Sequence, residues 1–221
     1  MARKEPAFRI AREGRPFVVV PAVLAAVLAA AALATGMAVL GVLAGLAALA
    51  AGFCAFFFRD PRRIVPGDPD AIVSPADGRV MAVERRDGRW RIAIFLSIFD
   101  VHVNRSPEAG TVERVAYHKG RFLAAFRPEA ARVNERNHVV LRTARGRVEV
   151  VQIAGLVARR IVCRLAPGAS VGRGERFGLI RFGSCTELWL PDTAEPAVRP
   201  GQRVVGGQTV ISRWGSGGAD R

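Results

Sequence analysis

One uncharged stretch, FVVVPAVLAAVLAAAALATGMAVLGVLAGLAALAAGFCAFFF (Phe17–Phe58), decides the architecture of the N-terminal part of the chain. A transmembrane helix needs about 20 apolar residues, so this stretch is long enough for two spans. Thr35-Gly36 lies near its middle and can form a turn. The sequence therefore predicts a transmembrane helical hairpin with helices at Phe17–Ala34 and Ala38–Phe58.

Basic residues flank the apolar stretch on both sides. By the positive-inside rule, both ends of the hairpin should lie in the cytoplasm. One long tilted helix is the alternative, but it would leave one basic flank outside. A cleaved signal peptide would need a shorter apolar core followed by a cleavage site. We therefore expect a membrane anchor at residues 1–63 and a cytoplasmic globular domain at residues 64–221. The flanking residues are Arg9, Arg12, Arg15, Arg59, Arg62 and Arg63.

The overall charge suggests anionic partners. The chain has 33 Lys and Arg against 19 Asp and Glu, a net charge of +14. Acidic lipids and nucleic acid are the usual partners of such a chain, and the scarcity of aromatic residues argues against nucleic acid. A genomic preference for Arg is an alternative origin of the charge, because only Lys4 and Lys119 are lysines. The cysteines have no C-x-x-C spacing, so we expect no zinc site and no disulfide framework. They are Cys54, Cys163 and Cys185.

Short runs of β-branched residues broken by Gly and Pro characterise the rest of the chain. This pattern predicts a mainly β (α+β) globular domain. Ala144-Arg145-Gly146 is expected to form a hairpin turn, and helical periodicity is weak except at Ala130–Asn134. The predicted strands are Ala71–Val73, Arg79–Arg85, Trp90–Leu96, Gly110–Tyr117, Val139–Thr143, Arg147–Ile153, Arg160–Leu165, Phe177–Phe182, Thr186–Leu190, Gln202–Val205 and Thr209–Arg213.

Histidines limit the acid–base chemistry that this chain can perform, because it has only His102, His118 and His138. If the segment around His102 is extended, the side chains of Asp100, His102 and Asn104 point to one face. Taken alone, a histidine beside an aspartate on a strand is more often structural than catalytic.

Two further short sequences could carry chemistry. Asp77 lies in Ser-Pro-Ala-Asp-Gly, which by itself is a turn signal. Ser184 follows Gly183, whose carbonyl has no bulky side chain to shield it from the serine hydroxyl. Most isolated Gly-Ser pairs are ordinary loops, and this one is not the G-x-S-x-G elbow of α/β-hydrolases. The sequence contains no P-loop and no dinucleotide-binding glycine motif.

Taken in order, these segments resemble the short bacterial and archaeal form of phosphatidylserine decarboxylase. The resemblance extends from about Arg59 to Val210, and its specificity lies in the combination of segments. They are FFRDPRR (57–63), VSPADG (73–78), FLSIFDVHVNRSP (95–107), YHKGRF (117–122), NERN (134–137) and RFGS (181–184).

The resemblance implies a self-cleaving enzyme. Cleavage between Gly183 and Ser184 would give a β chain and an α chain of 221 − 183 = 38 residues. Ser184 would become a covalent pyruvoyl group that forms a Schiff base with phosphatidylserine and yields phosphatidylethanolamine in phospholipid biosynthesis. The enzyme would act at the inner cell membrane as the two chains of one precursor, and could form a homo-oligomer.

The resemblance also suggests roles for individual residues. Ser184, His102 and Asp77 are the expected catalytic residues, with His102 as the base and Asp77 as its partner. The expected substrate-binding residues are Asn104, Arg105 and His118. The long bacterial form has a second histidine three residues after the first, where this chain has Arg105. His118 and then His138 therefore remain alternatives for the base.

Two other functions fit parts of the sequence. A membrane-anchored β-rich adaptor or barrel-sandwich carrier would explain the Gly-spaced strands, but no lysine lies at a hairpin tip near Asp77. A pyruvoyl decarboxylase acting on a soluble amino acid would not need the apolar hairpin. We expect no bound metal in any of these cases.

Overall fold

The computed structural model describes residues 9–123, 130–156, 160–181 and 183–215. Its internal contacts divide the chain into two compact units, Met1–Arg62 and Arg63–Arg221. The assignment of one unit to anchoring and the other to catalysis stays a prediction at this point.

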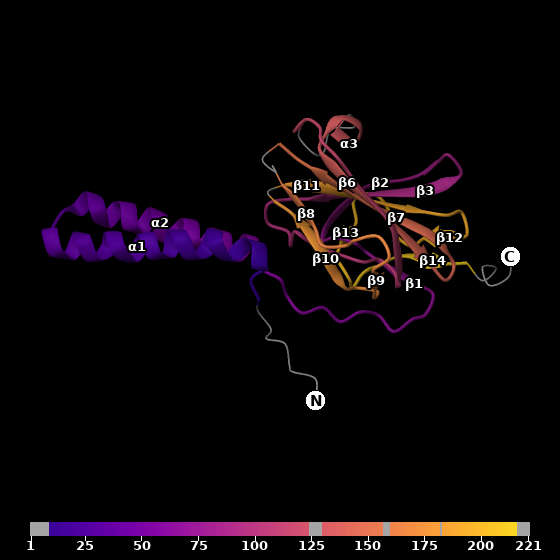
Figure 1. Cartoon of the computed structure of the whole chain (residues 1–221), viewed down its shortest axis with the longest axis horizontal. Coiled ribbons are helices and arrows are strands. Elements are labelled where there is room, and N and C mark those ends of the chain that lie inside the picture. Colours follow the sequence, from indigo (N-terminus) through magenta and orange to yellow (C-terminus); the bar gives the residue numbers. More distant parts are fainter. Residues whose placement is uncertain (1–8, 124–129, 157–159, 182, 216–221) are drawn as a thin grey trace. The chain divides into compact units, whose positions relative to one another are not determined.

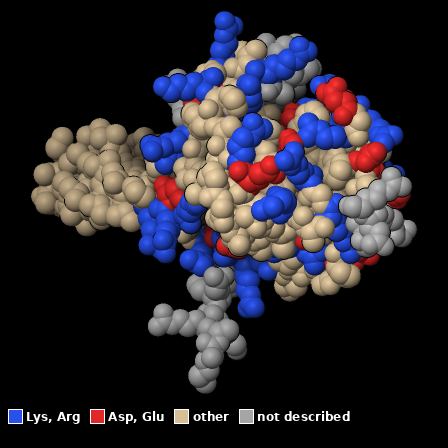
Figure 2. Space-filling model, turned by 45° about the vertical axis from the view of Figure 1, so that its right-hand side comes forward, with Lys and Arg blue, Asp and Glu red and all other residues tan. Residues whose placement is uncertain are grey.

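The N-terminal unit is the predicted helical hairpin (Figure 1). A short 3-10 helix, η1 (Arg12–Gly14), leads into α1 (Arg15–Thr35), and α2 (Ala38–Phe57) follows. Gly36 ends α1 with a φ of 70°, a conformation that glycine adopts without strain. Both helices are long and apolar enough to cross a membrane. Their apolar side chains face outward, as Leu33 does at 88% exposure, and the protruding part of the hairpin shows no charged side chain in Figure 2.

The C-terminal unit is built on a curled antiparallel sheet of eight strands (Figure 1). Its central strands are long, and β11 lies between β3 and β7. In spatial order the strands are β13 (Arg203–Val204), β2 (Gly78–Arg86), β3 (Arg89–Leu96), β11 (Ser184–Leu190), β7 (Gly146–Ala154), β6 (Arg136–Thr143), β5 (Gly110–His118) and β9 (Ser170–Val171).

Two three-stranded sheets and a short helix complete this unit. One sheet contains β1 (Ala71–Val73), β14 (Val210–Trp214) and β12 (Ala194–Pro196), and the other contains β4 (Val103–Arg105), β10 (Arg176–Ile180) and β8 (Ile161–Cys163). The helix is α3 (Ala130–Val133), as its weak periodicity predicted. Every predicted strand overlaps an observed one, although Phe182 lies outside the described residues. The short strands β4, β9 and β12 were not predicted.

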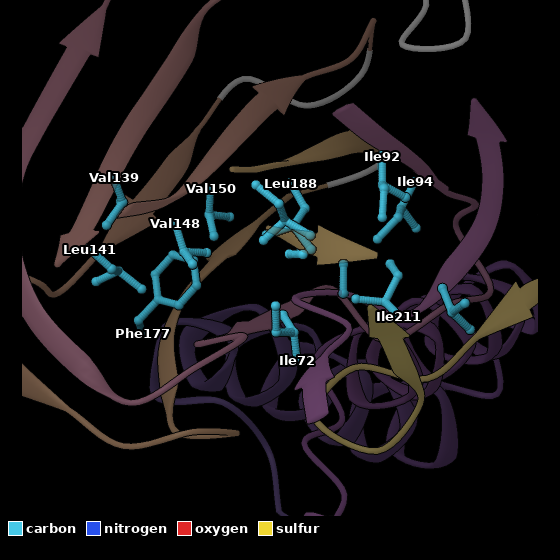
Figure 3. Close-up of a cluster of buried hydrophobic side chains, with 14 of the residues drawn as sticks. Ile72, Ile92, Ile94, Val139, Leu141, Val148, Val150, Phe177, Leu188 and Ile211 are labelled. Atoms are coloured by element: carbon cyan, nitrogen blue, oxygen red, sulfur yellow. The ribbon is translucent and has the colours of Figure 1, made fainter. Parts of the chain in front are cut away.

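The alternation of side chains along β11 decides which residues face the core. Leu188 and Leu190 point into the main hydrophobic cluster, so Thr186 and Ser184 lie on the same side of the sheet. Cys185 belongs to a separate cluster on the other face. Figure 3 shows the main cluster, with side chains from β3, β6, β7, β11 and β14 around Leu188. Ser184 therefore begins the central strand on its core-facing side.

The position of Leu188 makes it a test of this core. Leu188→Ala removes a fully buried side chain, and a cavity of that kind typically lowers the free energy of unfolding by about 2–5 kcal/mol. We expect a thermal midpoint several degrees lower for the full chain in detergent. Met81→Ala, at an exposed position of β2, should leave the midpoint nearly unchanged. Equal shifts for the two variants would contradict the packing described here.

Candidate active site

Ser184 is the buried first residue of β11, a central strand of the large sheet. Its residue is fully inaccessible to solvent, and it pairs with Leu96 of β3 on one side and with Ala154 of β7 on the other. Its Oγ has no hydrogen-bond partner among the residues that the structure describes. Leaving a buried hydroxyl unpaired costs about 1–3 kcal/mol, so such groups are rare in folded proteins. The site thus keeps a serine hydroxyl dry and uncommitted at the start of a rigid strand.

Gly183 immediately precedes this serine and has a left-handed backbone with a φ of 69°. Space does not explain the glycine, because a Cβ at this position would meet no atom within 4 Å. The backbone conformation does, since it is strained for residues with a side chain. The N–H of Gly183 donates a hydrogen bond of 3.2 Å to Nε2 of His102. The Gly-Ser peptide and the histidine predicted to act on it therefore lie together.

The tautomer of His102 follows from its hydrogen bonds. The ring is buried at 2% exposure, and its Nδ1 lies 2.9 Å from the main-chain oxygen of Asp100. A carbonyl oxygen only accepts, so Nδ1 carries the proton. Nε2 then presents its lone pair, which accepts from the Gly183 N–H. His102 is accordingly a neutral imidazole with its basic nitrogen directed at the Gly183-Ser184 segment.

Asp100 holds the loop that orients His102. One oxygen of its carboxylate accepts from the Ser97 N–H at 2.8 Å and from the Ser97 hydroxyl at 2.7 Å. The other lies 3.2 Å from the Arg203 guanidinium. The segment is therefore a turn at Asp100 and becomes a strand only at Val103. This corrects the expectation that the side chains of Asp100, His102 and Asn104 share one face of an extended strand.

Asp77 is held by a different set of partners. Its carboxylate forms a 2.7 Å ion pair with Arg63 and accepts from the Gly206 N–H at 2.7 Å. Burial raises the pKa of Asp77, and the charge of Arg63 partly opposes this shift. Asp100 lies near enough to raise it further. The expected pairing of Asp77 with His102 stays a prediction.

A chain of buried amides lies beneath the core-facing side of β11. Asn137 donates to Gln152 at 2.9 Å, Gln152 donates to Asn104 at 2.9 Å, and Asn104 donates to the Thr186 hydroxyl at 3.1 Å. The four residues are at most 2% exposed. Because their polar atoms satisfy one another, this amide chain ties β4, β6, β7 and β11 into one rigid support. Asn104, expected to bind substrate, is a member of it.

The other expected substrate-binding residues lie further from Ser184. Arg105 is 5% exposed and donates to the Gly174 carbonyl at 3.1 Å. His118 is exposed at the end of β5, in register through β6 and β7 with Cys185. Since paired residues of a sheet point to the same side, His118 lies on the face opposite Ser184.

His138 also lies on the opposite face. It is in register through Val151 with Glu187, and its Nε2 lies 2.8 Å from the Glu149 carboxylate. This contact lowers the pKa of Glu149 more than any other influence does. Of the three histidines, His102 is thus the one that the structure brings to Ser184.

Comparison with known proteins gives the family of the chain. The family model described as phosphatidylserine decarboxylase matches residues 50–212. A phosphatidylserine decarboxylase proenzyme of Symbiobacterium thermophilum is 53% identical over 92% of this chain and 95% of its own. The proenzymes of Gluconacetobacter diazotrophicus and Carboxydothermus hydrogenoformans are 53% and 50% identical over 73% of this chain, covering 77% and 79% of their own lengths. The chain belongs to the phosphatidylserine decarboxylase family. It is therefore an enzyme of the decarboxylase class, and the resemblance found in its sequence is confirmed.

The amide chain is the part of the decarboxylase site that sequence analysis missed. Gln152 has no motif around it, and Asn137 was noted only as the last residue of NERN (134–137), without a role of its own. A weak signal exists in Val151-Gln152-Ile153, where an amide interrupts a run of buried apolar residues. A polar side chain in such a run requires a partner, but its partners here come from other strands.

The amide chain can be tested through Gln152. Gln152→Leu keeps most of the side-chain volume but leaves the Asn137 donor and the Asn104 acceptor unpaired, at about 1–3 kcal/mol each. We expect a clearly lower thermal midpoint. Gln202→Leu, at a glutamine whose side-chain oxygen accepts from the Arg199 N–H in a turn, is the matched control. A midpoint unchanged by Gln152→Leu would show that the amides do not support the site.

Proposed function

We propose that this chain converts phosphatidylserine to phosphatidylethanolamine after cleaving itself between Gly183 and Ser184. The observation that carries the proposal is the buried, unpartnered Oγ of Ser184 beside Gly183, whose N–H contacts the basic nitrogen of His102. A serine meant for structure would have a hydrogen-bond partner. A serine meant to attack its own preceding carbonyl needs an uncommitted hydroxyl and a nearby base.

In the first step, Ser184 Oγ attacks the Gly183 carbonyl carbon. His102 Nε2 accepts the hydroxyl proton and returns it to the departing Ser184 nitrogen, so that the amide becomes an ester with a free amine. The Asp100 carbonyl keeps the imidazole in the tautomer that this step requires. Because the sheet fixes Ser184 on both sides, the left-handed Gly183 is the part of the chain that can adjust.

In the second step, the Ser184 α-proton is removed and the Gly183 carboxylate leaves from the β-carbon. The remaining dehydroalanine takes up water and loses ammonia, which leaves a pyruvoyl group at the start of the α chain. That group would supply an electrophilic carbonyl for the substrate amine and an electron sink for the loss of carbon dioxide. His102 is placed to hold and deliver the proton that replaces the lost carboxylate.

The remaining expected residues take supporting roles in this proposal. Asp77 is the buried acid of the site, and it acts on His102 indirectly, through Asp100. The charges of Asp77 and Asp100 lie close enough to interact, and the main-chain carbonyl of Asp100 orients His102. Asn104 positions β11 through Thr186. Arg105 and His118 are the candidates for contacts with the substrate head group.

The location follows from the hairpin and its basic flanks. We place α1 and α2 in the inner cell membrane, with residues 64–221 on the cytoplasmic side, because basic flanks remain in the cytoplasm. The enzyme would then work on phospholipid within the same bilayer as part of phospholipid biosynthesis. The β and α chains are its two parts after cleavage.

Cleavage can be measured directly by intact mass. The purified chain should give two fragments that meet between residues 183 and 184, with a blocked, borohydride-sensitive α-chain terminus. Ser184→Ala should remain one chain and release no carbon dioxide from the lipid. Ser170→Ala, at an exposed serine of β9, should process normally. An α chain that begins with an ordinary serine amine would refute the proposal.

The base is tested by comparing histidines. General acid–base help is typically worth about 10²–10⁴-fold, so His102→Ala should slow self-cleavage by at least that lower factor in a time course of fragment formation. His138→Ala removes a histidine on the other face of the sheet and should cleave at the parent rate. Normal cleavage by His102→Ala would move the base to His118.

A further inference from the structure

The end of the large sheet at which Ser184 begins β11 carries exposed apolar side chains. We call this row of strand ends and their loops the edge at Ser184. The strands that flank Ser184 end at Leu96 and Ala154, and the chain continues from these ends into loops. In the first loop Ile98 is 41% exposed and Phe99 66% exposed, and in the second Leu156 is 62% exposed. Two or three residues reach about 7–11 Å, so these side chains lie on both sides of the serine at this edge.

This apolar character belongs to one edge only of the described strands. Tyr117 at the end of β5 and Val133 beside the start of β6 are 51% and 37% exposed at the same edge. The opposite edge holds the turns that join β2 to β3 and β6 to β7, with exposed Arg86 and Asp87 in the first. A domain that is surrounded by water on all sides gains no stability from exposing apolar side chains at one end of its sheet.

Basic side chains accompany the apolar ones on both sides of Ser184. Arg203 is an exposed side chain held 3.2 Å from Asp100, in the Phe99 loop. Its register partner Arg79 is also exposed. Near the Leu156 loop, the exposed Arg121 forms an isolated backbone β-bridge with Asn134. The Asn134 side chain in turn donates to the Ala154 carbonyl at 2.8 Å.

We propose that this edge, formed by Ile98, Phe99 and Leu156 with Arg79, Arg121 and Arg203, docks on the surface of an anionic lipid bilayer. The apolar tips enter the interface between head groups and acyl chains, while the guanidinium groups bind lipid phosphates and carboxylates. The inference rests on the proposed function in one respect: it names the surface through which the lipid amine reaches Ser184.

A bilayer fits this edge better than a second copy of the chain. The chain has two helices suited to spanning a membrane, so its globular unit stays beside a lipid surface. A second copy would bring the same cations against each other and repel, whereas an anionic surface complements them. A head group also remains at the bilayer surface, and a site that acts on it must face that surface.

Fluorescence quenching tests the docking with the full chain reconstituted in vesicles of phosphatidylcholine and phosphatidylglycerol. Phe99→Trp and Leu156→Trp add a reporter to the native tryptophans, and Arg86→Trp adds one at the opposite edge as the matched control. Replacing the phosphatidylcholine by its acyl-brominated form should quench the added emission at positions 99 and 156 but not at position 86. Equal behaviour at the three positions would overturn the proposal. The proposal would also be overturned if shielding of the added tryptophans from the brominated lipid grew with the number of chains per vesicle, because that would indicate an interface between copies.

A kinetic comparison adds a second readout. One basic residue near an anionic bilayer is worth about a fivefold change in affinity. Arg79→Gln should therefore raise the apparent KM for phosphatidylserine in vesicles about fivefold, with kcat and the rate on short-chain soluble substrate unchanged. Arg86→Gln should change neither. A loss of kcat on the soluble substrate would overturn a docking role for Arg79.

The docking and the proposed chemistry can fail separately. The quenching is therefore also measured in chains that carry Ser184→Ala, which need no cleavage to contact lipid. Quenching at positions 99 and 156 without any cleavage of the parent chain would support docking and refute the proposed function. Cleavage without quenching would do the reverse.

Discussion

The structure of this enzyme depends on holding one serine at the start of the central strand of its sheet. Ser184 is paired on both sides, and its buried hydroxyl has no partner among the described residues. Strands at the centre of a sheet have little freedom, so the hydroxyl cannot move toward a distant target. The peptide bond that lies nearest to it is the one immediately before it, where Gly183 has a left-handed conformation just ahead of β11. The amide chain beneath β11 stiffens the same support from below. In the proposed reaction, this confinement would direct the hydroxyl to its own preceding carbonyl.

The hydrogen bonds of His102 fix the form of its ring. A main-chain carbonyl holds Nδ1, so Nε2 presents its lone pair toward Gly183. In a Ser-His-Asp triad a buried carboxylate fixes the tautomer and also stabilises the imidazolium that forms during attack. In the reaction proposed for this chain, Nε2 would take the serine proton and return it to the departing nitrogen, and the same nitrogen would serve the later step on the substrate.

Much of the fold was predictable because it depends on local periodicity. The charge-free run gave the hairpin, and Gly and Pro separated the strands, so each predicted strand overlaps an observed one. The site was predictable only in part. His102 contacts Gly183, the residue before Ser184, but the amide chain joins Asn104 to Gln152 across 48 residues, and no local pattern reports such a contact. The outward positions of His118 and His138 depend on strand register, and β5 contains an irregularity between Val112 and Arg114 that the sequence does not reveal. The shared face of Asp100, His102 and Asn104 was expected only if their segment is extended, and the bonds of Asp100 to Ser97 make a turn there instead.

The path of the chain after Ser184 explains how a cleaved enzyme can keep its shape. The 38 residues that follow the proposed cut (221 − 183) contain β11 to β14. β11 is a central strand of the large sheet and β13 is one of its edges, whereas β14 pairs with both β1 and β12 in a second sheet. The short chain is thus woven through two sheets, and its Leu188, Leu190 and Ile211 are buried in the common core. Breaking one peptide bond removes none of these contacts, so separation of the chains would require unfolding the whole unit. The proposed cut would also fall at the boundary of the strand and not inside it, because Gly183 lies just outside β11.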